Sequence, residues 1–264
     1  MIGVFDSGVG GMTVARAIEQ LLPQYPLAYF GDLARTPYGS KSAGTIAGYS
    51  CQNTEFLLEQ GAKIIVIACN TAASIASDLL RQRFDVPIFE VISPAVHTAL
   101  RCTANGRIGV IGTRATIRSG VYERTIREQR EDAQVYSQPC PLLVPLVEEG
   151  WLDKRETKMI VRRYLQPLKN NQVDTLVLGC THYPLLKEII QARIGKKVQV
   201  IDSSAALAAG LRDYLDRHPQ LAAELSVDGQ ASRYYVSDVT EAAMAIAQRI
   251  FGRPIALEKV LMDH

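Results

Sequence analysis

IIVIACNT at residues 64–71 and TLVLGCTH at residues 175–182 are the two stretches that decide the fold. Each is a short run of β-branched and other apolar residues that ends in a cysteine followed by polar residues. Continuous apolar runs of this length are typical of strands that are buried on both faces of a parallel sheet. The two stretches therefore predict a parallel sheet, and their likeness predicts that the same unit occurs twice.

Similar apolar runs lie on both sides of these stretches and alternate with segments of helical period. In the first half, strands are predicted at 2–5, 27–30, 64–68 and 87–91, and helices at 13–22, 43–60 and 72–84. After Pro94 the pattern begins again, with a helix near 95–103 and strands at 108–112, 134–138, 175–179 and 198–202. This alternation predicts an α/β fold in which helices cover both faces of mostly parallel sheets.

The beginnings of the two halves also resemble each other. IGVFDSGVGGMTVARAI at 2–18 and IGVIGTRATIRSGVYERTI at 108–126 both predict a strand, a polar turn and a helix. The last segment predicts a helix at 204–218, a strand at 234–238 and a helix at 240–251, and we expect it to pack on the first half. We therefore predict two pseudo-symmetric domains, 1–93 plus 204–264 and 94–203, with the active site in the cleft between them.

Composition narrows the class of partner. The chain has 264 residues, 47% of them hydrophobic, and a formal net charge of +2, without a run of basic residues interleaved with aromatic ones. Neither nucleic acid nor a membrane is therefore expected as a partner, which leaves a small molecule. The five cysteines form an odd set without a C-x-x-C pair, and neither a signal peptide nor a membrane span is recognisable, so we expect free thiols in a soluble, cytoplasmic protein.

Two cysteines carry the chemistry that the sequence predicts. Ligands of open α/β sheets bind beyond the carboxyl ends of the strands, where Cys69 and Cys180 lie. A helix N-terminus favours thiolate, so this placement is expected to lower the thiol pKa, and His182 could hydrogen-bond the second thiol or exchange a proton with it. Either cysteine alone could be a small apolar residue, but two at matching positions of a repeat favour chemistry.

The pairing of the thiols predicts the type of reaction. Inversion of a stereocentre through a carbanion needs a base on one face and an acid on the other, with the roles exchanged in the reverse direction. Two related domains that face each other across a cleft supply this arrangement. We expect one thiolate and one thiol, with the protonation pattern of the pair set by the enantiomer bound.

Further polar residues stand at strand ends. The glycine loop DSGVGG at 6–11 could form a backbone nest for a carboxylate or a phosphate, or could be only a tight turn. Asp6 and Asp32 could meet an ammonium group or orient a base, although Asp32 could also cap a helix. The hydroxyl and amide groups of four residues, Ser7, Asn70, Thr71 and Thr181, could hold carboxylates. Tyr38 and Gly39 could be plain turn residues, and Glu148 could be a solvated helix end.

Six blocks of the sequence resemble the glutamate racemase family. They are FDSGVGGMTV at 5–14, GDLARTPYGSKS at 31–42, ACNTAAS at 68–74, TRATIRSGVY at 113–122, CPLLVPLVEEG at 140–150 and LGCTHYPLL at 178–186. The resemblance implies a cytoplasmic bacterial enzyme, commonly a homodimer, that uses neither PLP nor a metal. It implies that the substrate is L- or D-glutamate, and that the D-glutamate formed supplies peptidoglycan synthesis.

The resemblance also implies roles for single residues. Cys69 and Cys180 are similar to the two catalytic acid/bases, and Asp6 and His182 are similar to the residues that assist them. The substrate-binding set that it implies is Asp6, Ser7, Tyr38, Gly39, Asn70, Thr71, Thr181 and His182, with Asp32 and Glu148 as further polar residues near the site.

Three other functions remain open at this stage. An aspartate racemase, or another amino-acid racemase of the same superfamily, would use the same mechanism on a side chain of different length. A metal hydrolase could use the two cysteines with His182 and Asp6, although their spacing does not resemble a ligand pair. A phosphate- or nucleotide-binding module could be built on the glycine loop and would leave both cysteines replaceable.

Overall fold

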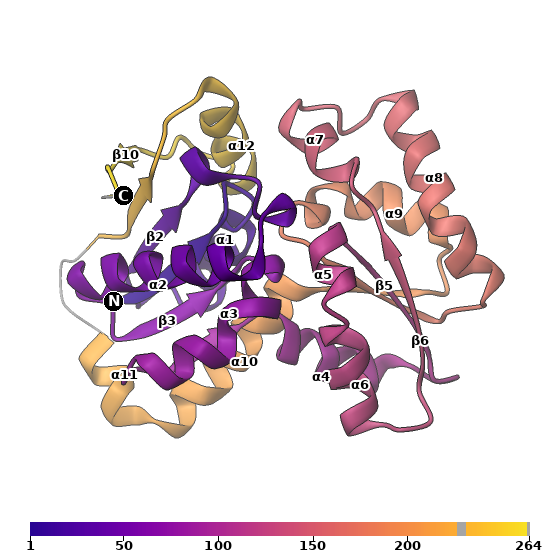
Figure 1. The fold of residues 1–264 in the computed structure, drawn as a ribbon, viewed down its shortest axis with the longest axis horizontal. Coiled ribbons are helices and arrows are strands. Elements are labelled where there is room, and N and C mark those ends of the chain that lie inside the picture. Colours follow the sequence, from indigo (N-terminus) through magenta and orange to yellow (C-terminus); the bar gives the residue numbers. More distant parts are fainter. Residues whose placement is uncertain (226–230, 263–264) are drawn as a thin grey trace.

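The computed structural model describes residues 1–225 and 231–262 and has two lobes, each built on one sheet (Figure 1). The strands of the first sheet are β1 (Ile2–Asp6), β2 (Leu27–Gly31), β3 (Ile64–Ile67), β4 (Ile88–Glu90), β9 (Arg233–Val236) and β10 (Leu257–Lys259). The strands of the second sheet are β5 (Arg107–Gly112), β6 (Gln134–Pro139), β7 (Thr175–Gly179) and β8 (Gln199–Asp202). We call the lobe of the six-stranded sheet the first lobe and the other the second lobe.

Four neighbouring strands of the first sheet have the same order as the four strands of the second. The first runs β10-β9-β2-β1-β3-β4 and the second runs β6-β5-β7-β8, so that β1 and β5 occupy equivalent central places. All strand pairs in the described residues are parallel, with Val4 opposite Val66 in the first sheet and Val110 opposite Val177 in the second. Cys69 follows β3 and Cys180 follows β7, which are equivalent strands. The structure thus confirms the predicted α/β fold with two related parallel sheets.

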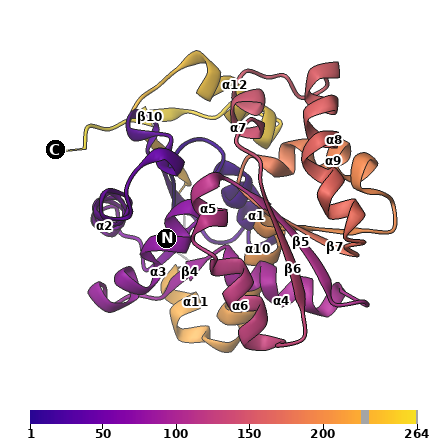
Figure 2. The same ribbon diagram turned by 45° about the vertical axis from the view of Figure 1, so that its right-hand side comes forward.

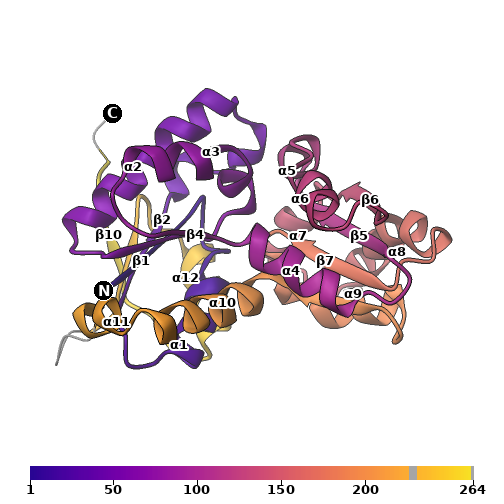
Figure 3. The ribbon, with the colours of Figure 1, turned by 90° about the horizontal axis from the view of Figure 1, so that it is seen from below.

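Helices cover both faces of each sheet (Figures 2 and 3). Those of the first lobe are α1 (Met12–Leu21), α2 (Ala43–Glu59), α3 (Asn70–Arg83), α10 (Ser203–Arg217), α11 (Pro219–Leu225) and α12 (Glu241–Phe251), with the 3-10 helices η1 (Leu33–Arg35) and η2 (Tyr38–Ser40). Those of the second lobe are α4 (Ile92–Cys102), α5 (Arg114–Arg118), α6 (Val121–Gln129), α7 (Leu143–Glu148), α8 (Arg155–Asn170) and α9 (Lys187–Ile194), with η3 (Tyr183–Leu186). In Figure 3, α2 and α3 lie on one side of the first sheet, and α1 and α10 lie on the other.

The hydrophobic core joins the lobes on one side. It runs from the first sheet through α10 and α4 to one face of the second sheet, where Val110 and Val177 belong to the same cluster as Val4 and Leu211. A separate cluster on the other face of the second sheet packs against α7, α8 and α9. Burying apolar residues in one continuous cluster stabilises the lobes together. None of the helices in the described residues combines the length and the apolar character needed to span a lipid bilayer.

The predicted strands agree with the structure to within about two residues at each end, as boundary assignment allows. Some elements were not predicted. They include β10, a three-residue strand at the sheet edge, and the helices of the segment that carries α7, α8 and α9. The strand at 234–238 is confirmed as β9 in a shorter form that ends at Val236, and the side chain of Ser237 donates to the Asp32 carboxylate.

Candidate active site

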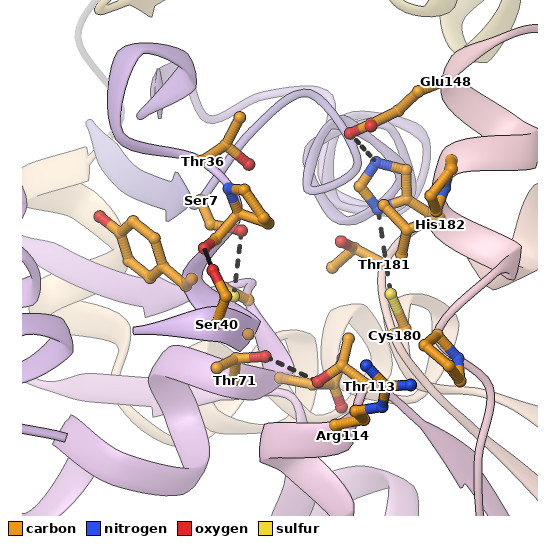
Figure 4. Close-up of a pocket in the computed structure, with 18 residues that line it drawn as sticks. Ser7, Thr36, Ser40, Thr71, Thr113, Arg114, Glu148, Cys180, Thr181 and His182 are labelled. Carbon is orange, nitrogen blue, oxygen red and sulfur yellow. Dashed lines mark hydrogen bonds and ion pairs between the residues drawn. The ribbon is translucent and has the colours of Figure 1, made fainter. Parts of the chain in front are cut away.

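A cavity of about 280 Å³ lies between the lobes, at the carboxyl ends of the strands. Its volume is near the lower end of typical ligand pockets, about 300 Å³, which fits a ligand the size of an amino acid. The first lobe contributes Ser7, Thr36, Pro37, Tyr38, Gly39, Ser40, Cys69, Asn70 and Thr71. The second lobe contributes Thr113, Arg114, Pro141, Val144, Pro145, Glu148, Cys180, Thr181 and His182. Ten of these residues are labelled in Figure 4.

Four equivalent strands place four of these side chains. Ser7 follows β1 and Cys69 follows β3 in the first lobe, while Thr113 follows β5 and Cys180 follows β7 in the second. Parallel strands bring their carboxyl ends to one edge, and here the edges of two sheets meet at the same cavity. Both cysteines are free thiols. The cavity therefore receives one thiol from each lobe, as the repeat predicts.

Cys69 is the N-cap of α3, so this helix begins two residues earlier than the sequence predicts. Its Sγ accepts from the N–H of Ala72 at 3.5 Å and lies 3.4 Å from Oγ of Ser7, to which the thiol donates. The expected lowering of the thiol pKa is wrong for this cysteine. Burial, and next the charge of Asp6, raise the pKa of Cys69 to about 12, and the helix N-terminus does not offset them.

Cys180 is placed differently, because the short 3-10 helix η3 follows it rather than an α-helix. Its Sγ lies 3.9 Å from Nδ1 of His182, whose Nε2 lies 3.3 Å from Oε1 of Glu148 (Figure 4). Burial alone would lower the pKa of His182, but the neighbouring Cys180 sulfur and Glu148 carboxylate raise it to about 10. The imidazole is thus protonated at neutral pH and places a positive charge beside the Cys180 sulfur.

Asp6 lies behind the cavity, not in its lining. Its carboxylate accepts from the N–H of Gly8 at 3.0 Å and lies 3.4 Å from Oγ1 of Thr181, in the other lobe. Burial is the main cause that raises its pKa, against the lowering effects of His182 and of backbone N–H groups from Gly11 and Gly8. The glycine loop is therefore not an open nest for a foreign anion, because its N–H groups bind the chain's own carboxylate.

Asn70 and Thr71 begin α3 and line the cavity. Oγ1 of Thr71 lies 3.1 Å from Oγ1 of Thr113, so these hydroxyls meet across the lobes (Figure 4). Oδ1 of Asn70 accepts from the hydroxyl of Tyr122 at 2.6 Å. Nδ2 of Asn70 is buried and has no partner among the described residues. A buried donor without a partner is unusual in a folded protein and is expected where a ligand supplies the acceptor.

Asp32 also lies outside the lining, although Tyr38 and Gly39 lie in it. The Asp32 carboxylate accepts from Nε of Arg35 at 2.7 Å, from Oγ of Ser237 at 3.0 Å and from the Tyr38 hydroxyl. This carboxylate therefore holds the turn that carries Tyr38 and Gly39 from behind. Ten of the twelve predicted site residues line the cavity, and the two that do not are Asp6 and Asp32.

Eight residues of the lining were not predicted. They are Thr36, Pro37, Ser40, Thr113, Arg114, Pro141, Val144 and Pro145. A signal was present for Thr113, because it follows β5 as Ser7 follows β1 in the repeat. Arg114 is the one arginine or lysine among these eight, and it is exposed. For the metal-hydrolase alternative, residues 1–225 and 231–262 contain no group of three or more His, Cys, Asp or Glu side chains arranged to hold a metal ion.

The chain is similar to known racemases in its sequence. Residues 10–211 match the family model described as Asp/Glu/Hydantoin racemase. The chain is 45% identical to a glutamate racemase of Persephonella marina, covering 98% of this chain and 96% of that protein.

Solved structures give the same answer. Glutamate racemase isoform RacE1 from Bacillus anthracis superposes with a TM-score of 0.92 at 35% identity, covering 98% of this chain and 97% of that one. Glutamate racemase from Francisella tularensis in complex with D-glutamate superposes with a TM-score of 0.89 at 36% identity, covering 99% and 97%. The chain belongs to the Asp/Glu/hydantoin racemase family and, within it, to the glutamate racemases.

Proposed function

We propose that the chain interconverts L- and D-glutamate by moving the Cα proton between Cys69 and Cys180. One observation carries the proposal: the two thiols follow equivalent strands of different lobes and line the same cavity. A two-base racemase needs one acid/base group on each face of the reacting carbon. Support for glutamate comes from the relatives, among them one whose structure holds D-glutamate.

The protons balance over one turnover. A thiolate removes the Cα proton and the bond pair stays on the carbon, and the thiol on the opposite face then donates its proton to that carbon. The enantiomer leaves, and the protonation of the two sulfurs is the reverse of what it was. The pKa of Cys69, about 12, favours the thiol form of that residue before substrate binds, and the imidazolium of His182 stands beside Cys180.

The polar lining suits an amino acid with two carboxylates. Asn70 offers the unpartnered Nδ2, and Thr71 and Thr113 offer hydroxyl groups. Ser7 and Thr181 stand beside the two sulfur-bearing residues. Charge-assisted hydrogen bonds from such donors to a carboxylate are stronger than neutral ones. We infer that these residues hold glutamate, together with Tyr38, Gly39 and His182.

Asp6 and His182 assist the two thiols in this proposal. Asp6 is within hydrogen-bonding distance of Thr181 and its charge acts on Cys69, so it couples the two sides of the site. His182 stands beside Cys180, with Glu148 behind it. We assign Asp32 the positioning of the Tyr38 turn. Neither PLP nor a metal is part of the mechanism that we propose.

The wider setting is also a proposal. We infer that the D-glutamate formed supplies peptidoglycan synthesis and that the protein acts in the cytoplasm as a homodimer. Five free thiols support a reducing compartment. For the domains we propose 1–93 plus 204–264 and 94–203, which keeps the strands of each sheet within one domain.

Isotope exchange tests the proposal. In deuterated water, L-glutamate should lose optical rotation and gain deuterium at Cα, and Cys69→Ala and Cys180→Ala should each lose turnover in both directions. Cys102→Ala is the matched control, because Cys102 is an exposed free thiol outside the cavity. Turnover at the wild-type rate in either cavity variant would contradict the mechanism. A higher kcat/KM for aspartate than for glutamate would show that aspartate is the preferred substrate, while the two-thiol mechanism would stand.

A further inference from the structure

Tyr122 stands outside the cavity lining but joins its two sides. It belongs to α6 of the second lobe and its side chain is buried. Its hydroxyl donates to Oδ1 of Asn70, in the first lobe, at 2.6 Å. Tyr122 is not among the site residues predicted from the sequence.

This hydrogen bond decides which way the Asn70 amide faces. An asparagine side chain has one carbonyl acceptor and one NH₂ donor group on opposite sides of the same carbon. Since a hydroxyl holds Oδ1, Nδ2 must face the other way, where it has no partner among the described residues. The pKa of Tyr122 is raised well above its ordinary value by burial and next by the charge of Glu90, so the hydroxyl stays a donor across the neutral and alkaline range.

The ring of Tyr122 makes the second contact. A Cβ atom on Gly179 would lie 3.2 Å from Cε2 of Tyr122 and 2.8 Å from the carbonyl oxygen of Ile111. The absence of a side chain at Gly179 therefore lets the aromatic ring pack against the end of β7. Tyr122 thus touches the residue after Cys69 with its hydroxyl and the residue before Cys180 with its ring.

We propose that Tyr122 is a positioning residue, which orients Asn70 so that its amide NH₂ binds the substrate and which holds the two cysteine-bearing strand ends in register across the lobes. This inference rests on the proposed function, because the substrate that Asn70 meets is taken to be glutamate. The ring supplies the contact with Gly179, and the hydroxyl supplies the orientation. The two contributions are therefore separable by substitution.

Tyr122→Phe keeps the ring and removes the hydroxyl. We expect KM and the calorimetric Kd for glutamate to rise about fivefold, the equivalent of about one net hydrogen bond, while kcat changes less. Tyr235→Phe is the matched control, because Tyr235 is equally buried, donates to Oε1 of Gln60 at 3.0 Å and lies outside the cavity lining. Both variants should lose similar thermal stability, and only the first should bind glutamate more weakly.

A double-mutant cycle with Asn70→Ala tests the route of the effect. If Tyr122 acts through Asn70, Tyr122→Phe should change KM and Kd by less than about twofold in the Asn70→Ala background, because the bond that it removes is already absent. An unchanged Kd in the single variant, or an equal rise in both backgrounds, would overturn the proposal.

The binding readout separates this proposal from the proposed function. A wild-type chain that binds glutamate without exchanging its Cα proton would contradict racemisation, and Kd would still test Tyr122. A chain that binds no glutamate would overturn both.

Discussion

Nδ1 of His182 lies 3.9 Å from Sγ of Cys180, and the other nitrogen of the same ring lies 3.3 Å from a carboxylate oxygen of Glu148. The imidazole therefore couples a sulfur in the cavity to a carboxylate whose side chain is partly exposed. The Cys69 sulfur instead bonds Oγ of Ser7 and the N–H of Ala72, and burial, with the charge of Asp6, raises its pKa to about 12. Two sulfurs that follow equivalent strands thus have different neighbours, an imidazole beside Cys180 and a serine hydroxyl beside Cys69.

His182→Asn should reduce kcat by about 10²-fold, the usual contribution of a group that assists proton transfer. The two enantiomers have equal free energy, so kcat/KM must remain equal in both directions for any variant. Unequal effects on Cys69 and Cys180 will appear instead in kcat and KM separately, and in the primary isotope effects of Cα-deuterated L- and D-glutamate. We expect the larger isotope effect in the direction in which Cys180 removes the proton.

Glu148→Gln should have a smaller effect than His182→Asn, because the Glu148 side chain is partly exposed and solvent weakens its contact with the imidazole. Its kcat should fall less than that of His182→Asn.

The stability that protonated His182 contributes is complete below the unfolded pKa of about 6.5 and is lost as the pH rises through about 10. A wild-type protein whose thermal stability did not fall relative to His182→Asn over that window would contradict the charged imidazole.

Two neighbours shift the pKa of Cys69 in opposite directions, which gives a second prediction. The Asp6 charge raises it, and the hydrogen bond with Ser7 lowers it. Asp6→Asn should therefore increase the thiolate fraction of Cys69 and speed its alkylation by iodoacetamide at pH 8, whereas Ser7→Ala should slow it. Mass spectrometry of the peptide that contains Cys69 measures the rate.

Cys102 in the same samples is the internal control, since it is exposed and lies outside the cavity lining. Glutamate should protect Cys69 and leave Cys102 unchanged. Equal alkylation rates at Cys69 in the two variants would show that neither neighbour controls this thiol.

The sequence predicted the sheets and the two thiols because these depend on local patterns. Apolar runs such as 64–67 and 175–179 are typical of strands buried on both faces, and the repeat places Cys69 and Cys180 at equivalent ends. The short edge strand β10 has no such pattern, as its residues are mostly exposed. Buried strands can therefore be predicted from their apolar runs, and the cysteines at their ends can be paired because the two halves repeat.

Effects between residues far apart in the sequence could not be predicted in this way. The pKa of Cys69 depends on burial by the whole fold and on the charge of Asp6, which lies far from it in the sequence. Likewise, the meeting of Thr71 with Thr113 and of Asn70 with Tyr122 depends on how one sheet faces the other. The local rule that a helix N-terminus lowers a thiol pKa then gives the wrong direction for Cys69, because burial and the charge of Asp6 have larger effects.

Arg114 gives a third prediction, because it is an exposed arginine in the lining and forms no ion pair within residues 1–225 and 231–262. We expect Arg114→Gln to raise KM for glutamate about threefold at low salt, since a surface charge pair contributes less than about 1 kcal/mol. The difference should shrink as ionic strength rises, because exposed charges are screened.

Arg118→Gln is the control, because Arg118 ends the same short helix α5, is exposed and lies outside the lining. It should leave KM unchanged at every salt concentration. A salt-independent rise in KM for Arg114→Gln would assign the effect to shape instead of charge.

Gly10 tests how closely the first lobe supports His182. A Cβ atom on Gly10 would lie 2.4 Å from Nδ1 of His182 and 2.6 Å from Oγ1 of Thr181, so either the ring or the loop must move. A displacement of about 1 Å at a catalytic group costs about 10²-fold in rate, so Gly10→Ala should lower kcat by that order. Steady-state kinetics with both enantiomers measures it.

Gly48→Ala is the matched substitution, because Gly48 lies inside α2 and a Cβ atom there meets nothing within 4 Å. It should stabilise the protein by about 0.5–1 kcal/mol through helix propensity and leave kcat unchanged. If Gly10→Ala retains wild-type kcat, the loop that carries Gly10 can move to accommodate the methyl group. The position of His182 would then depend on Glu148 and on the segment that follows β7. Loss of kcat with only a small change in melting temperature would instead show that the contact between the lobes holds the imidazole against Cys180.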